Sequence, residues 1–117
     1  MSDWPNTSDT GSSSGASLPA NPIAKTGNYQ LVKGDMLIRF NTASGARTAT
    51  LPPAAAAFSA GKGDIVVLKK ITPDENTLIA MASGSDLIDG AISITTTDPY
   101  GCLMMQSTGA GWDVLSR

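Results

Sequence analysis

Carboxylates are the main candidates for acid–base chemistry in this chain, because the sequence contains no histidine. Asp86 and Asp89 stand on either side of Leu87 and Ile88, just before Gly90. Glycoside hydrolysis needs two carboxylates that face one cleft. An aspartate next to a turn glycine more often bonds nearby backbone N–H groups. We therefore expect Asp86 and Asp89 to stabilise a turn, with a bound cation or a catalytic pair as alternatives.

Other reactive groups are few. Cys102 is the only cysteine and lies in an apolar run, so we expect a small buried hydrophobic residue rather than a nucleophile. Residues 107–112 contain Gly-x-Gly but lack the third glycine and the following helix of a phosphate loop. We expect a hairpin turn there, leading to Trp112 in the core with its indole N–H bonded to a loop carbonyl. An exposed sugar-stacking role for Trp112 is the alternative. We predict no catalytic residue, cofactor or metal.

Composition limits the possible partners. The formal net charge is −2, and the largest basic cluster is the pair Lys69-Lys70. Tight nucleic-acid binding uses several Lys or Arg residues on one surface, so we exclude nucleic acid as the main partner. We see neither a secretory signal nor an apolar run of the roughly 18 residues that a membrane helix needs. A single cysteine excludes an intramolecular disulfide, and we expect the chain to mature in a reducing cytoplasm.

The first 23 residues differ from the rest. Residues 8–17 are mainly Ser and Gly, without apolar periodicity, and such tracts cannot form a core. Trp4, Leu18 and Ile23 flank this tract. Either residues 1–23 are a disordered tail, or they are an extended arm that docks on a partner through these three side chains. We favour the arm, since tryptophan is a preferred interface anchor.

Residues 24–117 are predicted to form a β-domain, because short apolar runs alternate with Gly, Pro and Asp. The expected strands are residues 28–32, 36–41, 47–51, 64–70, 77–82, 87–88, 91–96, 101–107 and 112–116. We expect the first two to form a hairpin around Gly34, and residues 64–70 to be buried on both faces. Residues 53–58 are the only good helix candidate, a short Ala-rich helical turn that Pro53 opens.

The predicted fold class is therefore all-β. We expect a small antiparallel β-sandwich or barrel of about eight to nine short strands with an extended N-terminal arm. In the strand at residues 101–107, one of Met104 and Met105 should point inward and the other outward, where it could contact another subunit. A domain of this size gains stability by sharing a core between copies, so we predict a homotrimer.

Four turn motifs carry a resemblance to a known class of proteins. They are Thr-Ala-Thr-Leu-Pro at residues 48–52, Gly-Lys-Gly-Asp at 61–64, Asp-Leu-Ile-Asp-Gly at 86–90 and Gly-Ala-Gly-Trp at 109–112. In this order they resemble the small β-modules of bacteriophage fibres, tailspikes and head-decoration proteins. The resemblance covers residues 48–117.

The resemblance implies a non-enzymatic virion protein. A single module with a low-complexity arm looks like a capsid decoration or head-fibre protein that is assembled in the host cytoplasm. It would trimerise, and its arm would attach to the major capsid protein or to another virion protein, without nucleic-acid binding or membrane insertion. The alternative is a tail-fibre or tailspike module that binds host surface glycan through exposed aromatic side chains. A spike-associated glycosidase would need a carboxylate pair in a groove between subunits.

Overall fold

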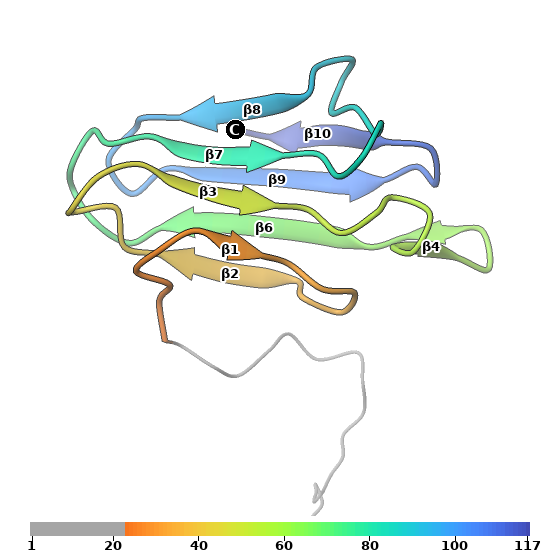
Figure 1. Cartoon of the computed structure of the whole chain (residues 1–117), viewed down its shortest axis with the longest axis horizontal. Helices are drawn as coiled ribbons and strands as arrows, with labels where there is room; N and C mark the ends of the chain where they lie inside the picture. Colours follow the sequence, from red (N-terminus) through yellow and green to blue (C-terminus); the bar gives the residue numbers. More distant parts are fainter. Residues whose placement is uncertain (1–22) are drawn as a thin grey trace, which may run out of the picture.

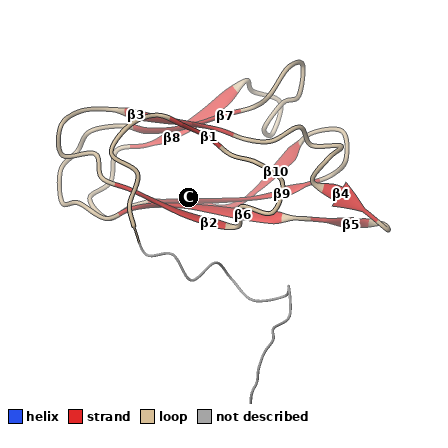
Figure 2. Ribbon diagram, turned by 60° about the horizontal axis from the view of Figure 1, so that its bottom comes forward, coloured by secondary structure: helices blue, strands red, loops and turns tan. Residues whose placement is uncertain are grey.

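Ten short strands and no helix make up residues 23–117, the part of the chain that the computed structural model describes. The front sheet of Figure 1 has the order β1-β3-β7-β8 and the back sheet the order β10-β9-β6-β2, with a small β4-β5 ribbon at one end. The strands are β1 (Tyr29–Gln30), β2 (Leu37–Phe40), β3 (Arg47–Thr50), β4 (Phe58–Ser59), β5 (Lys62–Gly63), β6 (Ile65–Lys70), β7 (Leu78–Met81), β8 (Ser93–Thr96), β9 (Cys102–Ser107) and β10 (Trp112–Ser116). Figure 2 shows the two sheets as separate layers, so the all-β prediction is confirmed as a sandwich.

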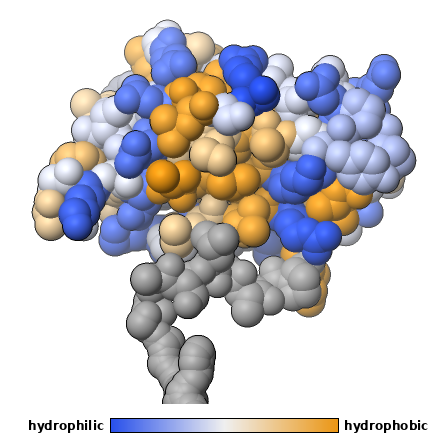
Figure 3. Space-filling model, turned by 180° about the vertical axis from the view of Figure 1, so that it is seen from behind, coloured by the Kyte–Doolittle hydropathy of each residue, from blue (hydrophilic) through white to orange (hydrophobic). Residues whose placement is uncertain are grey.

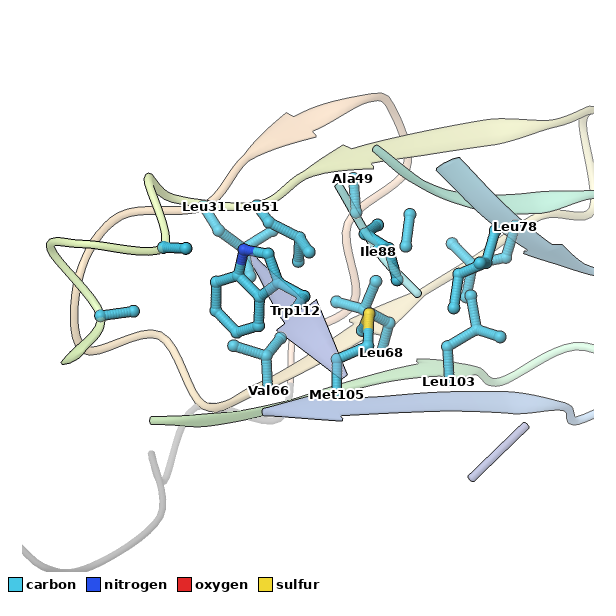
Figure 4. Close-up of a cluster of buried hydrophobic side chains, with 14 of the residues drawn as sticks. Leu31, Ala49, Leu51, Val66, Leu68, Leu78, Ile88, Leu103, Met105 and Trp112 are labelled. Carbon is cyan, nitrogen blue, oxygen red and sulfur yellow. The ribbon is translucent and has the colours of Figure 1, made fainter. Parts of the chain in front are cut away.

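The core lies between the two sheets. Alternate residues of β6 and β9 point inward, so that Val66, Leu68, Leu103 and Met105 are at most 1% exposed. Figure 4 shows these side chains meeting residues of the front sheet, with Trp112 at one end of the cluster. The outward residues of β6 are half-buried or exposed, so the prediction that this strand is buried on both faces is wrong.

The chain winds between the two sheets in its first half. It passes from β1 in the front sheet to β2 in the back sheet, then to β3, β6 and β7, changing sheet each time. Each strand therefore lies parallel to a neighbour in its own sheet: β1 pairs with β3, β3 with β7, and β2 with β6. The predicted hairpin of residues 28–32 and 36–41 is wrong, because the connection around Gly34 crosses between sheets.

The strands in the second half of the chain form antiparallel pairs, so the sandwich is mixed rather than purely antiparallel. β8 pairs with β7, and β9 pairs with β6. β10 folds back on β9 through the predicted hairpin turn, where the Thr108 N–H donates to the Gly111 carbonyl at 2.9 Å. The strand predicted at residues 87–88 is reduced to isolated bridges from Ile88 to Ala91 and Trp112.

The predicted Ala-rich helical turn is not confirmed. The Ala56 and Ala57 N–H groups donate to the Pro53 carbonyl at 3.0 and 3.2 Å, which makes a hydrogen-bonded turn. It goes no further, because Phe58 immediately enters β4 and pairs with Gly63 of β5. The Asp64 N–H then donates to the Ala57 carbonyl at 2.7 Å and closes this ribbon. The chain therefore continues from this turn into a local strand pair, and no helix forms.

Gly63 provides a test of how closely this ribbon packs. A Cβ atom at Gly63 would lie 1.8 Å from the Ser107 carbonyl oxygen, a backbone atom that no side-chain rotation can move. We expect Gly63→Ala to destabilise the fold by roughly 3 kcal/mol, the upper end for overpacking. The measurement is the midpoint of urea unfolding.

Gly27→Ala is the matched control, since a Cβ at Gly27 would have nothing within 4 Å. It should leave the midpoint nearly unchanged. Equal midpoints for the two variants would show that the ribbon moves freely away from β9.

Candidate functional site

Asp86 and Asp89 both accept hydrogen bonds from backbone N–H groups, but these donors are 32 and 25 residues away in the sequence, so the expected bonding to nearby N–H groups of the turn is wrong. Asp86 Oδ2 accepts a hydrogen bond from the Ala54 N–H at 2.8 Å, and Asp89 Oδ1 accepts one from the Val114 N–H at 3.2 Å. Asp89 also has a left-handed backbone (φ 48°), which places its own N–H against the Trp112 carbonyl at 2.9 Å. The two carboxylates therefore hold different segments in place.

Trp112 lies in the core, with 2% of its surface exposed, so the prediction of core packing is confirmed. Its indole ring is surrounded by Leu31, Leu51 and Val66 in Figure 4. The predicted hydrogen bond to a loop carbonyl is wrong, because the Nε1 atom has no partner within the described part of the chain. The reason is this apolar surrounding, which offers the ring packing without an acceptor.

Cys102 was expected to be a small buried hydrophobic residue, and this expectation is wrong. It is half-buried on the outer side of β9, because Leu103 and Met105 take the inward positions of the strand. Met105 is fully buried and Met104 is half-buried on the outer side, which confirms the prediction that the two methionines point in opposite directions.

The sequence interpretation missed a polar cluster around Lys70. This residue occupies an inward position of β6 and is 0% exposed. Its ammonium donates to three backbone carbonyls, those of Asp74 at 2.8 Å, Asn76 at 2.8 Å and Thr97 at 3.3 Å. An ammonium has three donors, so these bonds match its capacity. The sequence gives one signal of this burial: Lys70 follows Leu68 by two residues, so the two-residue period of a strand places both side chains on the same inward face.

Side chains from two connections complete the cluster. The Thr42 hydroxyl donates to Asp74 Oδ1 at 2.7 Å and lies 2.9 Å from the Thr72 hydroxyl. Asn76 Nδ2 donates to the Thr42 carbonyl at 2.7 Å. The hydroxyls of Thr72 and then Thr42 lower the pKa of Asp74 to about 2, because they stabilise the ionised carboxylate. The Lys70 ammonium lies 3.7 Å from Asp74 Oδ1.

The cluster joins the three connections at the left end of Figure 1. Residues 41–46 lead from β2 to β3, residues 71–77 from β6 to β7, and residues 97–101 from β8 to β9. Each of these connections crosses between the sheets. Asp74 Oδ2 is buried without a hydrogen-bond partner among the described residues. The other donors and acceptors of the cluster bond to one another, so it has the character of a structural clasp rather than of a reactive site.

The described surface is concave at two places that polar side chains line. A cavity of about 130 Å³ lies between Lys25, Tyr29, Asp35 and Arg39. There the Tyr29 hydroxyl donates to Asp35 Oδ2 at 2.9 Å, and this bond raises the pKa of Tyr29. A shallower polar hollow of about 310 Å³ is lined by residues 95–98 and Arg117. Within residues 23–117, no three His, Cys, Asp or Glu side chains gather closely enough to hold a metal ion.

The outer face of the back sheet is the most distinctive surface. Figure 3 views the molecule from this side and shows a central apolar area bordered by hydrophilic residues. The strand register places Leu37 beside Val67 and Val67 beside Met104, in one row across β2, β6 and β9. On β10 the partner of Met104 is Ser116, and Leu115, the unpaired residue just before it at a β-bulge, is 47% exposed. The row offers apolar contact rather than chemistry.

The predicted partner-binding residues are mostly beyond what the structure describes. Trp4 and Leu18 lie outside the described residues, and Ile23 is 74% exposed where the described chain begins. Among residues 23–117, no helix has the length and apolar character needed to cross a membrane. No protein-family model and no curated protein sequence matches this chain.

The lowered pKa of Asp74 predicts how stability depends on pH. A folded-state pKa below the ordinary value means that folding favours the ionised carboxylate. This contribution is fully present above about pH 4 and is lost as the pH falls toward 2. We expect the thermal midpoint of the wild type to fall between pH 4 and pH 2 more steeply than that of Asp74→Asn.

The control is Glu75→Gln, which removes the same charge from the exposed neighbouring residue. Its midpoint should follow the wild-type curve. If Asp74→Asn also follows that curve, the carboxylate at position 74 adds nothing to the clasp in its ionised form.

Proposed function

We propose that this chain is a non-enzymatic structural protein of a bacteriophage virion, a capsid decoration or head-fibre protein. Residues 1–23 attach it to the major capsid protein or to another virion protein, and residues 24–117 form a β-domain that trimerises. The proposal rests on the resemblance carried by the four turn motifs and on how those motifs pack in the fold.

One observation carries the proposal: the third and fourth motifs fix each other's backbone at one end of the sandwich. A Cβ at Gly111 of the fourth would lie 2.7 Å from the Leu87 carbonyl oxygen of the third, and the Trp112 N–H donates to that same oxygen at 2.9 Å. Gly63 of the second motif packs against the carbonyl of Ser107, two residues before the fourth. Because three of the motifs pack backbone against backbone here, they act as the signature of a structural module. Their carboxylates serve the fold.

The entry point of the chain supports attachment by the arm. The Lys25 N–H donates to the Arg39 carbonyl at 2.8 Å, and the Asn41 N–H donates to the Lys25 carbonyl at 2.9 Å. The described chain therefore begins at the outer edge of β2, away from the core between the sheets. Of the residues assigned to the arm, Ile23 contributes an exposed side chain rather than a core contact. Such a position leaves the β-domain complete without residues 1–23.

The glycan-binding alternative has one specific observation in its favour. Tyr100 is 55% exposed, and the Lys69 ammonium lies 5.9 Å from the centre of its ring. An exposed aromatic ring with a polar edge suits contact with a sugar. A tail-fibre or tailspike module would use Tyr100 in this way, whereas a capsid decoration protein would not need it.

Deletion of residues 1–23 tests the proposal. The truncated protein should unfold at nearly the wild-type temperature and should no longer co-sediment with phage capsids that lack this protein. Trp4→Ala in the full chain should weaken capsid binding by about tenfold or more, as expected for an anchor residue. Several arms acting together in a trimer would offset the entropy of ordering each one.

Tyr100→Ala is the control that separates the two functions. It should leave capsid binding unchanged. Binding of the wild type to host cells that Tyr100→Ala abolishes would support the glycan-binding alternative. Wild-type occupancy of capsids by the truncated protein would show instead that the β-domain is the anchor.

A further inference from the structure

We infer that the outer face of the back sheet is the surface through which copies of this chain contact one another. This inference rests on the proposed self-association and names the surface that would carry it. The partner is a second copy of the chain, and three observations lead to it: the apolar character of the face, its contrast with the front sheet, and the placement of its charges.

The central strands of the back sheet are apolar on both sides. β6 and β9 have six outward positions, and four of them are apolar: Ile65, Val67, Cys102 and Met104. An antiparallel sheet with one face in water normally alternates apolar and polar residues. Ile65 is 37% exposed, and Val67 and Met104 are half-buried rather than buried. This face therefore has apolar area that a partner could cover.

The front sheet provides an internal comparison. The two strands on either side of β7 have polar residues on the outer side: Thr48 and Thr50 in β3, and Ser93 and Thr95 in β8. Only β7 places apolar side chains between them. The same fold thus follows the usual polar pattern on one outer face and departs from it on the other. Small β-domains rarely leave a contiguous apolar patch exposed unless it is an interaction site.

Charged residues lie at opposite corners of the back sheet, with Arg39 of β2 beside Lys69 of β6 at one corner and Asp113 of β10 at the other. Lys69 of β6 stands level with Cys102, and its ammonium donates to the Tyr100 carbonyl. Asp113 of β10 stands level with Gln106 and with Ile65. Two strand spacings and four residues separate the corners, roughly 16 Å, so these charges cannot pair within one copy.

A second copy of this chain fits the face because every copy carries both the positive corner at Lys69 and the negative corner at Asp113. When the β10 side of one face overlaps the β6–β2 side of the next, Asp113 approaches Lys69 and the two apolar rows meet. Where each face is shared between two neighbouring copies in this way, the contact is heterologous and repeats into a closed ring, whereas full overlap of two faces would give a twofold dimer. The proposed trimer is a ring of this kind.

Two substitutions test the apolar row in the full-length chain. Met104→Lys places a charge at its centre, and we expect the trimer measured by light scattering at micromolar concentration to become a monomer with an unchanged circular dichroism spectrum. Ile92→Lys is the control, because Ile92 is 70% exposed outside both sheets. That variant should stay trimeric.

Exchanging the two charges tests the contact between the corners. The result comes from a comparison of three variants, so it does not depend on whether any one of them folds. Lys69→Asp and Asp113→Lys should each raise the dissociation constant by about tenfold or more, and the double variant should recover most of the wild-type affinity. A local effect of Lys69→Asp on Tyr100 would not be reversed by Asp113→Lys.

The outcomes separate this inference from the proposed function. Trimers of Met104→Lys as stable as the wild type, or a double variant that is weaker than both single variants, would overturn the face as the contact while leaving the virion role intact. A wild type that stays monomeric would overturn it as well. Loss of capsid binding on deletion of residues 1–23 is measured independently and bears only on attachment.

Discussion

The bonds of the Lys70 ammonium are the interaction on which the described fold depends most. A buried ammonium is costly unless every donor is used, and here three carbonyls accept from it. These carbonyls belong to two of the three connections that cross between the sheets at one end. Asn76 and Asp74 extend the bonding to Thr42 in the third. The Lys70 side chain, together with Asp74 and Asn76, thereby links the three connections to one another.

The clasp makes the winding topology possible. Parallel neighbours such as β2 with β6 and β3 with β7 require each connection to cross the thickness of the sandwich. Connections of this kind leave backbone carbonyls that neither sheet can satisfy, and Lys70 supplies donors to them. The opposite end is held differently, by glycines and aspartates that bring the turns into backbone contact. The outer face of the back sheet bonds to these ends only at its margins, where Lys69 donates to the Tyr100 carbonyl and Gln106 to the Gly63 carbonyl.

Strand positions could be predicted from the sequence, but their partners could not. The apolar runs at residues 64–70 and 101–107 located β6 and β9 within a residue or two, and the opposite directions of Met104 and Met105 followed from the two-residue period of a strand. The connection around Gly34 has turn chemistry that suits a hairpin, yet it crosses to the other sheet. Its short length fits both paths, and only the packing of the later strands decides between them.

Lys70 was not recognisable because its partners are main-chain carbonyls, which have no sequence signature. Trp112 was assigned to the core by its size, whereas its unpartnered indole N–H depends on which side chains surround it. Of the residues expected to bind a partner, Trp4 and Leu18 lie outside the described residues. Their assignment depends on composition alone.

The free energy of unfolding of Lys70→Met tests the clasp most directly, with Lys62→Met on the exposed β5 as the reference. Methionine keeps the apolar stem and removes the donors, so three partly buried carbonyls lose a partner. A buried acceptor left without a partner costs about 1–3 kcal/mol. We expect the free energy of unfolding in urea to fall by at least ~3 kcal/mol for Lys70→Met and to change by no more than about 0.5 kcal/mol for Lys62→Met. A Lys70→Met variant as stable as Lys62→Met would contradict this expectation, because the connections would then hold together without the clasp.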